Sequence, residues 1–206
     1  SFTDNGILFG EEAKNQSLKD PSNAIYDIKR IIGRKYSDPE FQKELKNWPF
    51  KVVSDFNDSP LIEVTYKGEI QQFTPVKIAS IIFEHIKEIA QNYVTSKYKF
   101  HKVKYVEIGV PLYYNKNQKD LIEDALKMAG FDDVKIMVNP IGSSIPIVQY
   151  DEIVNWLILD LGKSFDISLY DTTPEENDQT LFSQQTQKYV ISKKEVYTAV
   201  LEYLES

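Results

Sequence analysis

The sequence predicts a mixed α/β fold, and three features of the chain lead to this expectation. Between Leu61 and Tyr66 apolar and polar residues alternate, which is the period of a half-buried strand. After Thr74 and Pro75, apolar residues recur at the spacing of one helix face. From residue 103 to residue 138, a strand, a helix and a second strand follow one another, the order of a parallel βαβ unit.

The composition is that of an ordinary globular protein and argues against some partners. With 206 residues, 42% hydrophobic and 27% charged, the chain is long enough for a substantial core. Its net charge of −7 argues against a general electrostatic grip on nucleic acid or on an acidic membrane. The basic and aromatic residues of Lys97–Tyr105 could stack on single-stranded nucleic acid, but their alternation favours a guarded edge strand. We therefore expect neither nucleic acid nor membrane among the partners.

Cysteine and histidine usage bounds the chemistry. The absence of cysteine rules out disulfides and thiolate metal sites, and it fits a reducing compartment. His85 and His101 lie far apart in the sequence, so we expect neither a histidine zinc site nor a catalytic histidine. No apolar run approaches the roughly 18 residues of a membrane span, and the first residues lack the basic and apolar pattern of a signal peptide.

Residues 1–73 are expected to form the first of three domains, and their first half is helical with interruptions. Apolar residues at helical spacing predict a short helix that carries Lys29 and is ended by Gly33. These apolar positions are Ala24, Ile28, Ile31 and Ile32. Pro39 suits the first turn of a second helix.

The sequence pattern of the second half of this domain predicts three strands. The expected strands cover residues 51–56, 61–66 and 70–73. The last two are separated by a Lys67-Gly68-Glu69 segment that favours a tight turn.

Residues 74–152 are expected to form the second domain, which opens with the clearest helix of the chain. Thr74 is its cap, Pro75 is its first residue, and one wide apolar stripe follows. The stripe consists of Ile78, Ile81, Ile82, Ile86, Ile89 and Tyr93. A strand over 103–110, a helix over 118–129 ended by Gly130 and a strand over 134–138 come next.

Residues 153–206 are expected to open the third domain. The apolar run Asn155–Gly162 predicts a strand that is buried on both faces. The alternating segment Phe165–Asp171 follows at once, so the two segments predict a β-hairpin. A polar loop is expected over residues 171–178, and Ser192–Glu195 matches a capping box ahead of a last helix.

The turn of the predicted hairpin, Asp160–Ser164, ends in Gly-Lys-Ser as a phosphate-binding P-loop does. A P-loop needs another glycine five residues before its last one, and that position is Leu157, so a plain hairpin explains the segment better. Asp160 and Asp166 bracket the turn and could hold a hydrated Mg²⁺, although aspartates flank many turns. Lys29 and its basic neighbour could contact phosphate, but such pairs are more often a solvated face.

Several segments resemble, in content and order, the ATPase module of the seventy-kilodalton heat-shock family of chaperones. They include YDIKRIIGRKY, KNWPFKVV, VTYKGEIQQFTP, KEIAQNY and VEIGVPLYYNKNQKDLIEDALKMAGF. The resemblance implies an incomplete actin-like, ribonuclease H-like ATPase lobe: an upper α/β subdomain in residues 1–73, part of a lower subdomain in 74–152 and the beginning of a second lobe in 153–206. The WPF segment resembles the cytosolic branch, which implies a cytoplasmic protein of the stress response.

The resemblance covers only part of the family's module. The family's first phosphate-binding loop, its adenine pocket and its peptide-binding domain have no counterpart in the sequence. We therefore expect a piece of a longer protein. ATP and Mg²⁺ are the cofactors of the family, and this chain by itself is expected to bind neither.

The family's working residues can be carried over where the motifs match. Lys29 stands in the place of the catalytic lysine, which positions the attacking water and contacts the γ-phosphate. Asp160 and Asp166 match the two catalytic aspartates of the family's DLGGGTFD hairpin. The residues matched to nucleotide contacts in its turn are Gly162 and Ser164. Pro111 stands where a proline relays the nucleotide state between lobes, and Lys119 replaces the arginine partner of that proline.

The chain departs from the family at the phosphate-contacting positions. DLGGGTFD has become DLGKSFD, so the turn is one residue shorter and retains one of three glycines, which let a backbone approach phosphate. Asn139 stands where the family has a catalytic glutamate, and Thr180–Tyr197 replaces a glycine-rich phosphate motif without any glycine. Because phosphoryl transfer depends on electrostatic positioning, we expect turnover to fall by orders of magnitude.

Three functions stay open at the level of the sequence. The first is a catalytically silent chaperone relative whose scaffold docks J-domain co-chaperones and nucleotide-exchange factors. The second is a working ATPase in which Lys163 supplies positive charge to phosphate. The third is an interaction module without a nucleotide role. Lys135 stands where the family has an arginine used for J-domain contact, so that docking could survive with a weaker grip. Unfolded client peptides would bind only through a domain outside this chain.

Overall fold

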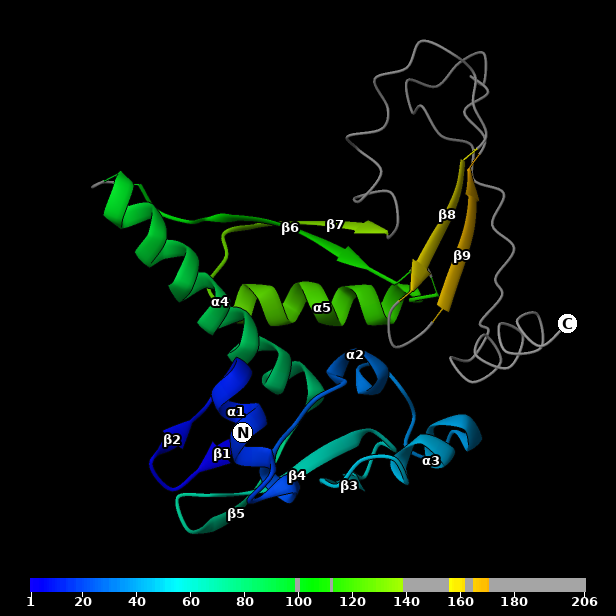
Figure 1. The fold of residues 1–206 in the computed structure, drawn as a ribbon. Helices are drawn as coiled ribbons and strands as arrows, with labels where there is room; N and C mark the ends of the chain where they lie inside the picture. Colours follow the sequence, from blue (N-terminus) through cyan, green and yellow to red (C-terminus); the bar gives the residue numbers. More distant parts are fainter. Residues whose placement is uncertain (99–100, 112, 139–155, 162–164, 171–206) are drawn as a thin grey trace, which may run out of the picture. The chain divides into compact units, whose positions relative to one another are not determined.

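The computed structural model describes residues 1–98, 101–111, 113–138, 156–161 and 165–170 (Figure 1). The chain divides into two compact units. One holds residues 1–108 and 114–136, and the other holds residues 109–113 and 137–206. The predicted domain boundaries after residues 73 and 152 stay predictions.

The chain begins with a short hairpin and a helix. The strands β1 (Phe2–Thr3) and β2 (Gly6–Ile7) pair antiparallel, and the helix α1 (Gly10–Ser17) follows. We did not predict this hairpin, because strands of two residues are too short to show a period in the sequence. The ring of Phe9 stacks on that of His85 with 3.9 Å between centroids, and His85 is half-buried, as expected for a residue at the edge of the core.

The predicted helix around Lys29 is shorter than the sequence pattern indicated. A 3₁₀ turn, η1 (Pro21–Asn23), is followed by extended Ala24, and the helix α2 covers only Ile28–Ile31. The prediction that Ala24 belongs to this helix is wrong, because Asp27 has a left-handed backbone that separates the two segments. The helix α3 (Pro39–Leu45) begins at Pro39 as predicted, and the carboxylate of Asp38 caps it by accepting from Glu40 N and Phe41 N.

The strands β3 (Lys51–Ser54), β4 (Pro60–Tyr66) and β5 (Glu69–Phe73) form an antiparallel sheet in the order β3-β4-β5. The predicted tight turn is confirmed. Lys67 and Gly68 both have positive φ angles, 54° and 77°, and Tyr66 pairs with Glu69. The strand β3 ends two residues earlier than predicted, because the carboxylate of Asp55 accepts from Asn57 N and Ser59 N and folds the chain into a turn.

An aromatic and aliphatic core fills the space between this sheet, α2, α3 and the start of the chain. Its buried members are Phe2, Ile31, Phe41, Trp48, Phe50, Val52, Ile62, Val64 and Ile78. The ring of Trp48 stacks on Phe50 at 5.6 Å and contacts Phe41 at 5.8 Å. The Trp-Pro-Phe segment thus serves as the centre of this core.

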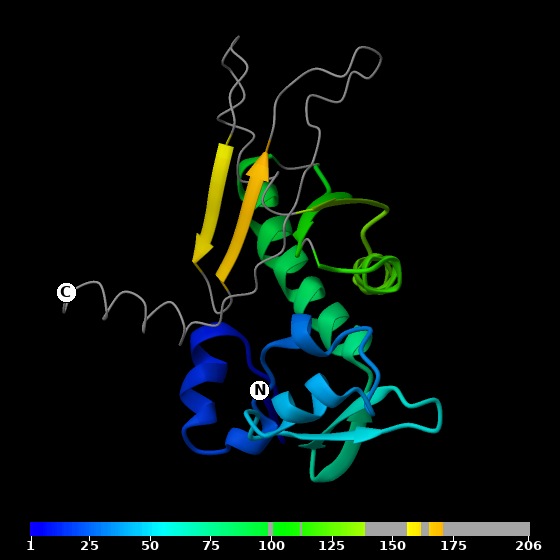
Figure 2. The same cartoon turned by 90° about the vertical axis from the view of Figure 1, so that its right-hand side faces the viewer.

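The long helix α4 (Pro75–Lys97) is the predicted one, with the Thr74 hydroxyl accepting from Lys77 N as the cap. Figures 1 and 2 show α4 running from the sheet past α5. Only part of its apolar stripe is buried. Ile78 is buried in the core, whereas Ile86, Ile89 and Tyr93 are more than half exposed in this structure. The stripe marked the helix correctly but did not show which part of it packs.

The predicted βαβ unit is present. The strand β6 (Tyr105–Val110) pairs with β7 (Asp133–Val138), and the helix α5 (Lys116–Met128) lies between them in the sequence and packs against α4. Lys104 pairs with Asp132 at 3.2 Å and Glu107 with Lys135 at 3.1 Å, so the residue numbers rise together along both strands, as in a parallel pair. The helix α5 begins two residues before the predicted Gln118, because Asn115 and Gln118 form a capping box.

The β-hairpin predicted from Asn155–Gly162 and Phe165–Asp171 is confirmed. The strands β8 (Trp156–Leu161) and β9 (Phe165–Tyr170) pair antiparallel, and their register sets Asp160 opposite Asp166 and Leu161 opposite Phe165. The polar loop expected over residues 171–178 and the capping box expected over 192–195 lie outside the described residues.

Candidate functional site

Lys29 lies on a turn whose backbone is set at both ends. We call Asp27–Gly33 the Lys29 turn. At its start, Asp27 has a φ of 58°, and the indole of Trp48 donates to the Asp27 carboxylate at 3.3 Å. At its end, Gly33 has a φ of 70°, a conformation that favours glycine, and this confirms the predicted stop. The core residue Trp48 therefore contacts the segment that carries the predicted catalytic lysine.

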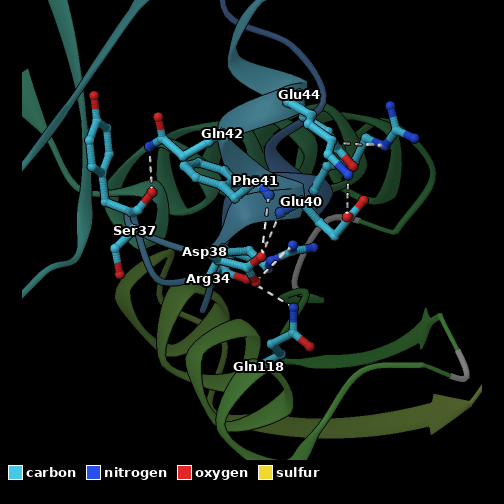
Figure 3. Close-up of polar contacts among 12 residues, drawn as sticks. Arg34, Ser37, Asp38, Glu40, Phe41, Gln42, Glu44 and Gln118 are labelled. Carbon is cyan, nitrogen blue, oxygen red and sulfur yellow. Dashed lines mark hydrogen bonds and ion pairs between the residues drawn. The ribbon is translucent and has the colours of Figure 1, made fainter.

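Two side chains from a distant part of the chain bind the carbonyl groups of this turn. The hydroxyl of Tyr114 donates to the carbonyl oxygen of Lys29 at 2.6 Å, and the amide of Gln118 donates to that of Ile32 at 3.0 Å. Both side chains are buried, with Tyr114 4% and Gln118 6% exposed. Figure 3 shows Gln118 reaching up from α5 toward the segment of Arg34 and Asp38. We call these two hydrogen bonds the carbonyl clamp.

The carbonyl clamp satisfies groups that a short helix leaves open. The last carbonyl groups of any helix lack partners within the helix, and a helix of four residues has no stability of its own. Gly33 also lies so close to α5 that a Cβ atom there would approach the Cγ atom of Gln118 to 2.6 Å. The turn and α5 therefore fit together without spare room.

Ion pairs join the Lys29 turn, and the residue that follows it, to α3 and its capping residue. Arg30 pairs with Glu44 at 3.6 Å, and Arg34 pairs with Asp38 at 3.0 Å. The Glu40 backbone N–H, with a smaller contribution from the Arg34 charge, holds the pKa of Asp38 below its usual value. The side chain of Lys29 is exposed, and it makes no ion pair with another residue in the described part of the chain. Its ammonium group is thus available to a ligand, while its backbone is fixed.

Asp160 and Asp166 are brought together by the register of the hairpin. They are Cα partners in neighbouring strands, next to the turn, as predicted. The turn residues Gly162 and Ser164, predicted to contact nucleotide, lie outside the described residues. The hairpin and Lys29 belong to different units, and the catalytic roles expected for Lys29, Asp160 and Asp166 stay predictions.

The predicted relay residues are also in different units. Pro111 follows β6 and is half-buried, and Lys119 lies in the first turn of α5 and is half-buried. A contact between them stays a prediction. Lys135, predicted for J-domain contact, lies on β7 with a largely exposed side chain that pairs with Glu107.

The sequence analysis missed the residues of the carbonyl clamp. The spacing of Asn115 and Gln118 matches a capping box and could have marked the start of α5. Nothing local marks Tyr114 or Gln118 as a partner of the Lys29 turn, because the sequence separations are 85 and 86 residues.

The described residues show neither a metal-binding cluster nor a membrane-spanning helix. No group of three or more His, Cys, Asp or Glu side chains there is placed to hold a metal ion. Among the helices that the structure describes, none is long and apolar enough to cross a membrane.

Comparison with known proteins identifies relatives for most of the chain. The family model described as "Hsp70 protein" matches residues 1–174. The heat shock 70 kDa proteins of Emericella nidulans and Neurospora crassa are each 39% identical over 173 residues, covering 82% of this chain and 26% of the relative. A ribosome-associated molecular chaperone of Eremothecium gossypii is 37% identical over 174 residues, covering 82% of this chain and 27% of that protein. The chain thus spans about a quarter of the length of these relatives, and it belongs to the Hsp70 family.

Proposed function

We propose that this chain is part of the ATPase domain of an Hsp70-type chaperone and acts mainly as a scaffold for partner proteins, with nucleotide turnover lost or strongly reduced. The observation that carries the proposal is the register of the β8–β9 hairpin. Leu161 pairs with Phe165, so Gly162–Ser164 alone connect the two strands. The hairpin keeps its two aspartates, and its turn is one residue shorter than the family's and retains one of three glycines.

This turn suits phosphate poorly. A backbone that wraps phosphate needs several amide groups in unusual conformations, which glycine permits. Here one glycine remains, and Lys163 brings a positive charge between Asp160 and Asp166. The two carboxylates would suit a hydrated Mg²⁺, but a lysine lies between them in the sequence, and we expect its charge to compete with the ion. Asn139 in place of a glutamate removes a further negative charge.

The partners that follow from the family are J-domain co-chaperones and nucleotide-exchange factors. Lys135 keeps a positive charge on β7, but its ammonium group is already bound to Glu107. A lysine also lacks the two-pronged geometry of arginine, so we expect a weak J-domain contact. Client peptides would be held by another domain of the whole protein, which we expect to work in the cytoplasm.

The test of this function is a calorimetric titration of the full-length protein with ATP, with and without Mg²⁺. We expect no Mg²⁺-dependent binding at micromolar ATP. Micromolar affinity that depends on Mg²⁺ would contradict the scaffold function.

A working ATPase is the second candidate, and one observation favours it. The exposed side chain of Lys29 makes no ion pair within the described residues, while two side-chain hydrogen bonds hold the carbonyl groups of its turn. If Lys29 serves in turnover, its replacement by alanine should abolish ATP hydrolysis by the full-length protein. This outcome would favour the second candidate over the scaffold function.

A further inference from the structure

The carbonyl clamp joins the segment after β6 to the Lys29 turn. Tyr114 directly precedes the capping residue Asn115, and Gln118 lies in the first turn of α5. The amide of Gln118 has two functions at once. Its oxygen accepts from Asn115 N, and its nitrogen donates to Ile32 O. The start of α5 and the end of α2 are therefore fixed by the same side chain.

We propose that Tyr114 is a positioning residue for Lys29, with Gln118 as the second point of support. The catalytic side of the proposal rests on the second candidate function above, in which Lys29 serves ATP turnover, whereas the placement of the turn does not depend on it. The hydroxyl of Tyr114 donates to the carbonyl oxygen of Lys29 itself. It therefore fixes the backbone of the residue whose side chain carries the ammonium group. Gln118 binds the carbonyl oxygen of Ile32, three residues later. With two carbonyl groups bound, the turn cannot rotate about the Tyr114 hydrogen bond alone.

The geometry favours positioning over plain packing for three reasons. The Tyr114 ring is buried, and a phenylalanine would fill the same space without the hydrogen bond. The carbonyl that Tyr114 binds belongs to Lys29, whose side chain is exposed and which stands in the place of the family's catalytic lysine. The helix α2 is too short to hold this residue by its own hydrogen bonds. A shift of about 1 Å at such a residue costs on the order of a hundredfold in rate where the group serves catalysis.

The decisive variant is Tyr114→Phe in the full-length protein, because it removes a single oxygen atom. Tyr36→Phe is the matched control, since the hydroxyl of Tyr36 also donates to a backbone carbonyl, that of Val52 at 3.4 Å. The replacement of Tyr114 by 4-aminophenylalanine keeps a donor in the same place and tests rescue. Gln118→Glu removes the donor at the second point while keeping the shape of the side chain.

Two readouts need no nucleotide turnover, so they stay informative if the protein is catalytically silent. One is hydrogen exchange at the amides of Arg30 and Ile32, which bond within the turn to Asp27 O and Ile28 O. The other is the acylation rate of the Lys29 amine relative to that of Lys43, measured by peptide mass spectrometry. We expect Tyr114→Phe to raise exchange in the turn about fivefold, the effect of one lost hydrogen bond. The relative acylation rate of Lys29 should change as well.

The exchange and acylation results either support or overturn the proposal. Changes confined to the Lys29 turn in Tyr114→Phe and Gln118→Glu, absent in Tyr36→Phe and reversed by 4-aminophenylalanine, support the proposal. Equal exchange in the turn for the two phenylalanine variants overturns it. Exchange that rises by the same factor in α3 and β4 also overturns it, because Tyr114 would then serve general stability.

If the full-length protein turns over ATP, kcat should fall in Tyr114→Phe with KM unchanged. Absence of turnover, which the scaffold function predicts, contradicts a catalytic role of Lys29, and the exchange measurements then decide whether Tyr114 positions the turn.

Discussion

The Lys29 turn and the β8–β9 hairpin carry the residues matched to catalysis, and they are built in different ways. The turn is held by side chains from outside its own segment, namely Trp48, Tyr114 and Gln118. In the hairpin, β8 and β9 pair with each other, and Gly162–Ser164 connect them. A change in the hairpin turn therefore alters the site directly, whereas the position of Lys29 depends on residues elsewhere in the fold.

The two regions depart from the family's sequence pattern to different degrees. The residues around Lys29 also support the core and the start of α5, so a substitution there lowers stability as well as activity. The hairpin turn is one residue shorter than the family's and holds Lys163 and one glycine. Substitutions that test this dependence are expected to have unequal effects.

The largest effect is expected from Phe41→Ala, which removes a fully buried ring next to Trp48. The loss of apolar contacts and the cavity should lower the free energy of unfolding by about 3–5 kcal/mol. The measurement is urea unfolding followed by circular dichroism. Phe56→Ala is the control, since this ring is 95% exposed, and its effect should stay within about 0.5 kcal/mol. Similar values for the two variants would contradict the described core.

A smaller effect is expected from Gly33→Ala, which tests the fit between the Lys29 turn and α5. Alanine disfavours the φ of 70°, and its Cβ would meet the side chain of Gln118. Gly68→Ala separates the two causes, because Gly68 has a similar φ of 77° with open space around it. We expect about 1–2 kcal/mol for the backbone strain in both variants and an additional loss only in Gly33→Ala. Equal losses in thermal unfolding would show that Gln118 yields without cost.

The smallest effect concerns the pH dependence that Asp38 contributes. Because the pKa of Asp38 is lowered in the folded state, its ionised form stabilises the fold above the unfolded pKa, about 4. This stability is lost as the pH falls through the folded pKa. In Asp38→Asn, the urea midpoint should therefore vary less between about pH 5 and pH 2 than in the wild type. An unchanged pH dependence would mean that Asp38 is not a source of the acid sensitivity.

The local features of the fold could be predicted from the sequence because their causes are local. Pro39, the Lys67-Gly68 turn and the Thr74 cap each act within a few residues, and each was confirmed. The boundaries of α2 could not be predicted, because the apolar spacing of Ala24 and Ile28 is the same whether or not Asp27 interrupts the helix.

The candidate site was predictable only in part. The resemblance to the family marked Lys29 and the two aspartates, and the antiparallel pairing of the aspartates followed from the short spacing between the strands. The carbonyl clamp was not predictable, because hydrogen bonds between residues more than 80 positions apart leave no periodic signal. The exposed half of the α4 stripe was missed for a related reason, since periodicity reports a face and not what covers it.

The central claim is that the Lys29 turn has kept its structure while the phosphate hairpin has lost its function. The most direct test is steady-state ATP turnover by the full-length protein and by its variants Lys29→Ala and Asp160→Asn. We predict that all three proteins show the same background rate, because the proposed function includes a hairpin turn that does not hold phosphate. A substantial wild-type rate that either substitution abolishes would contradict this account.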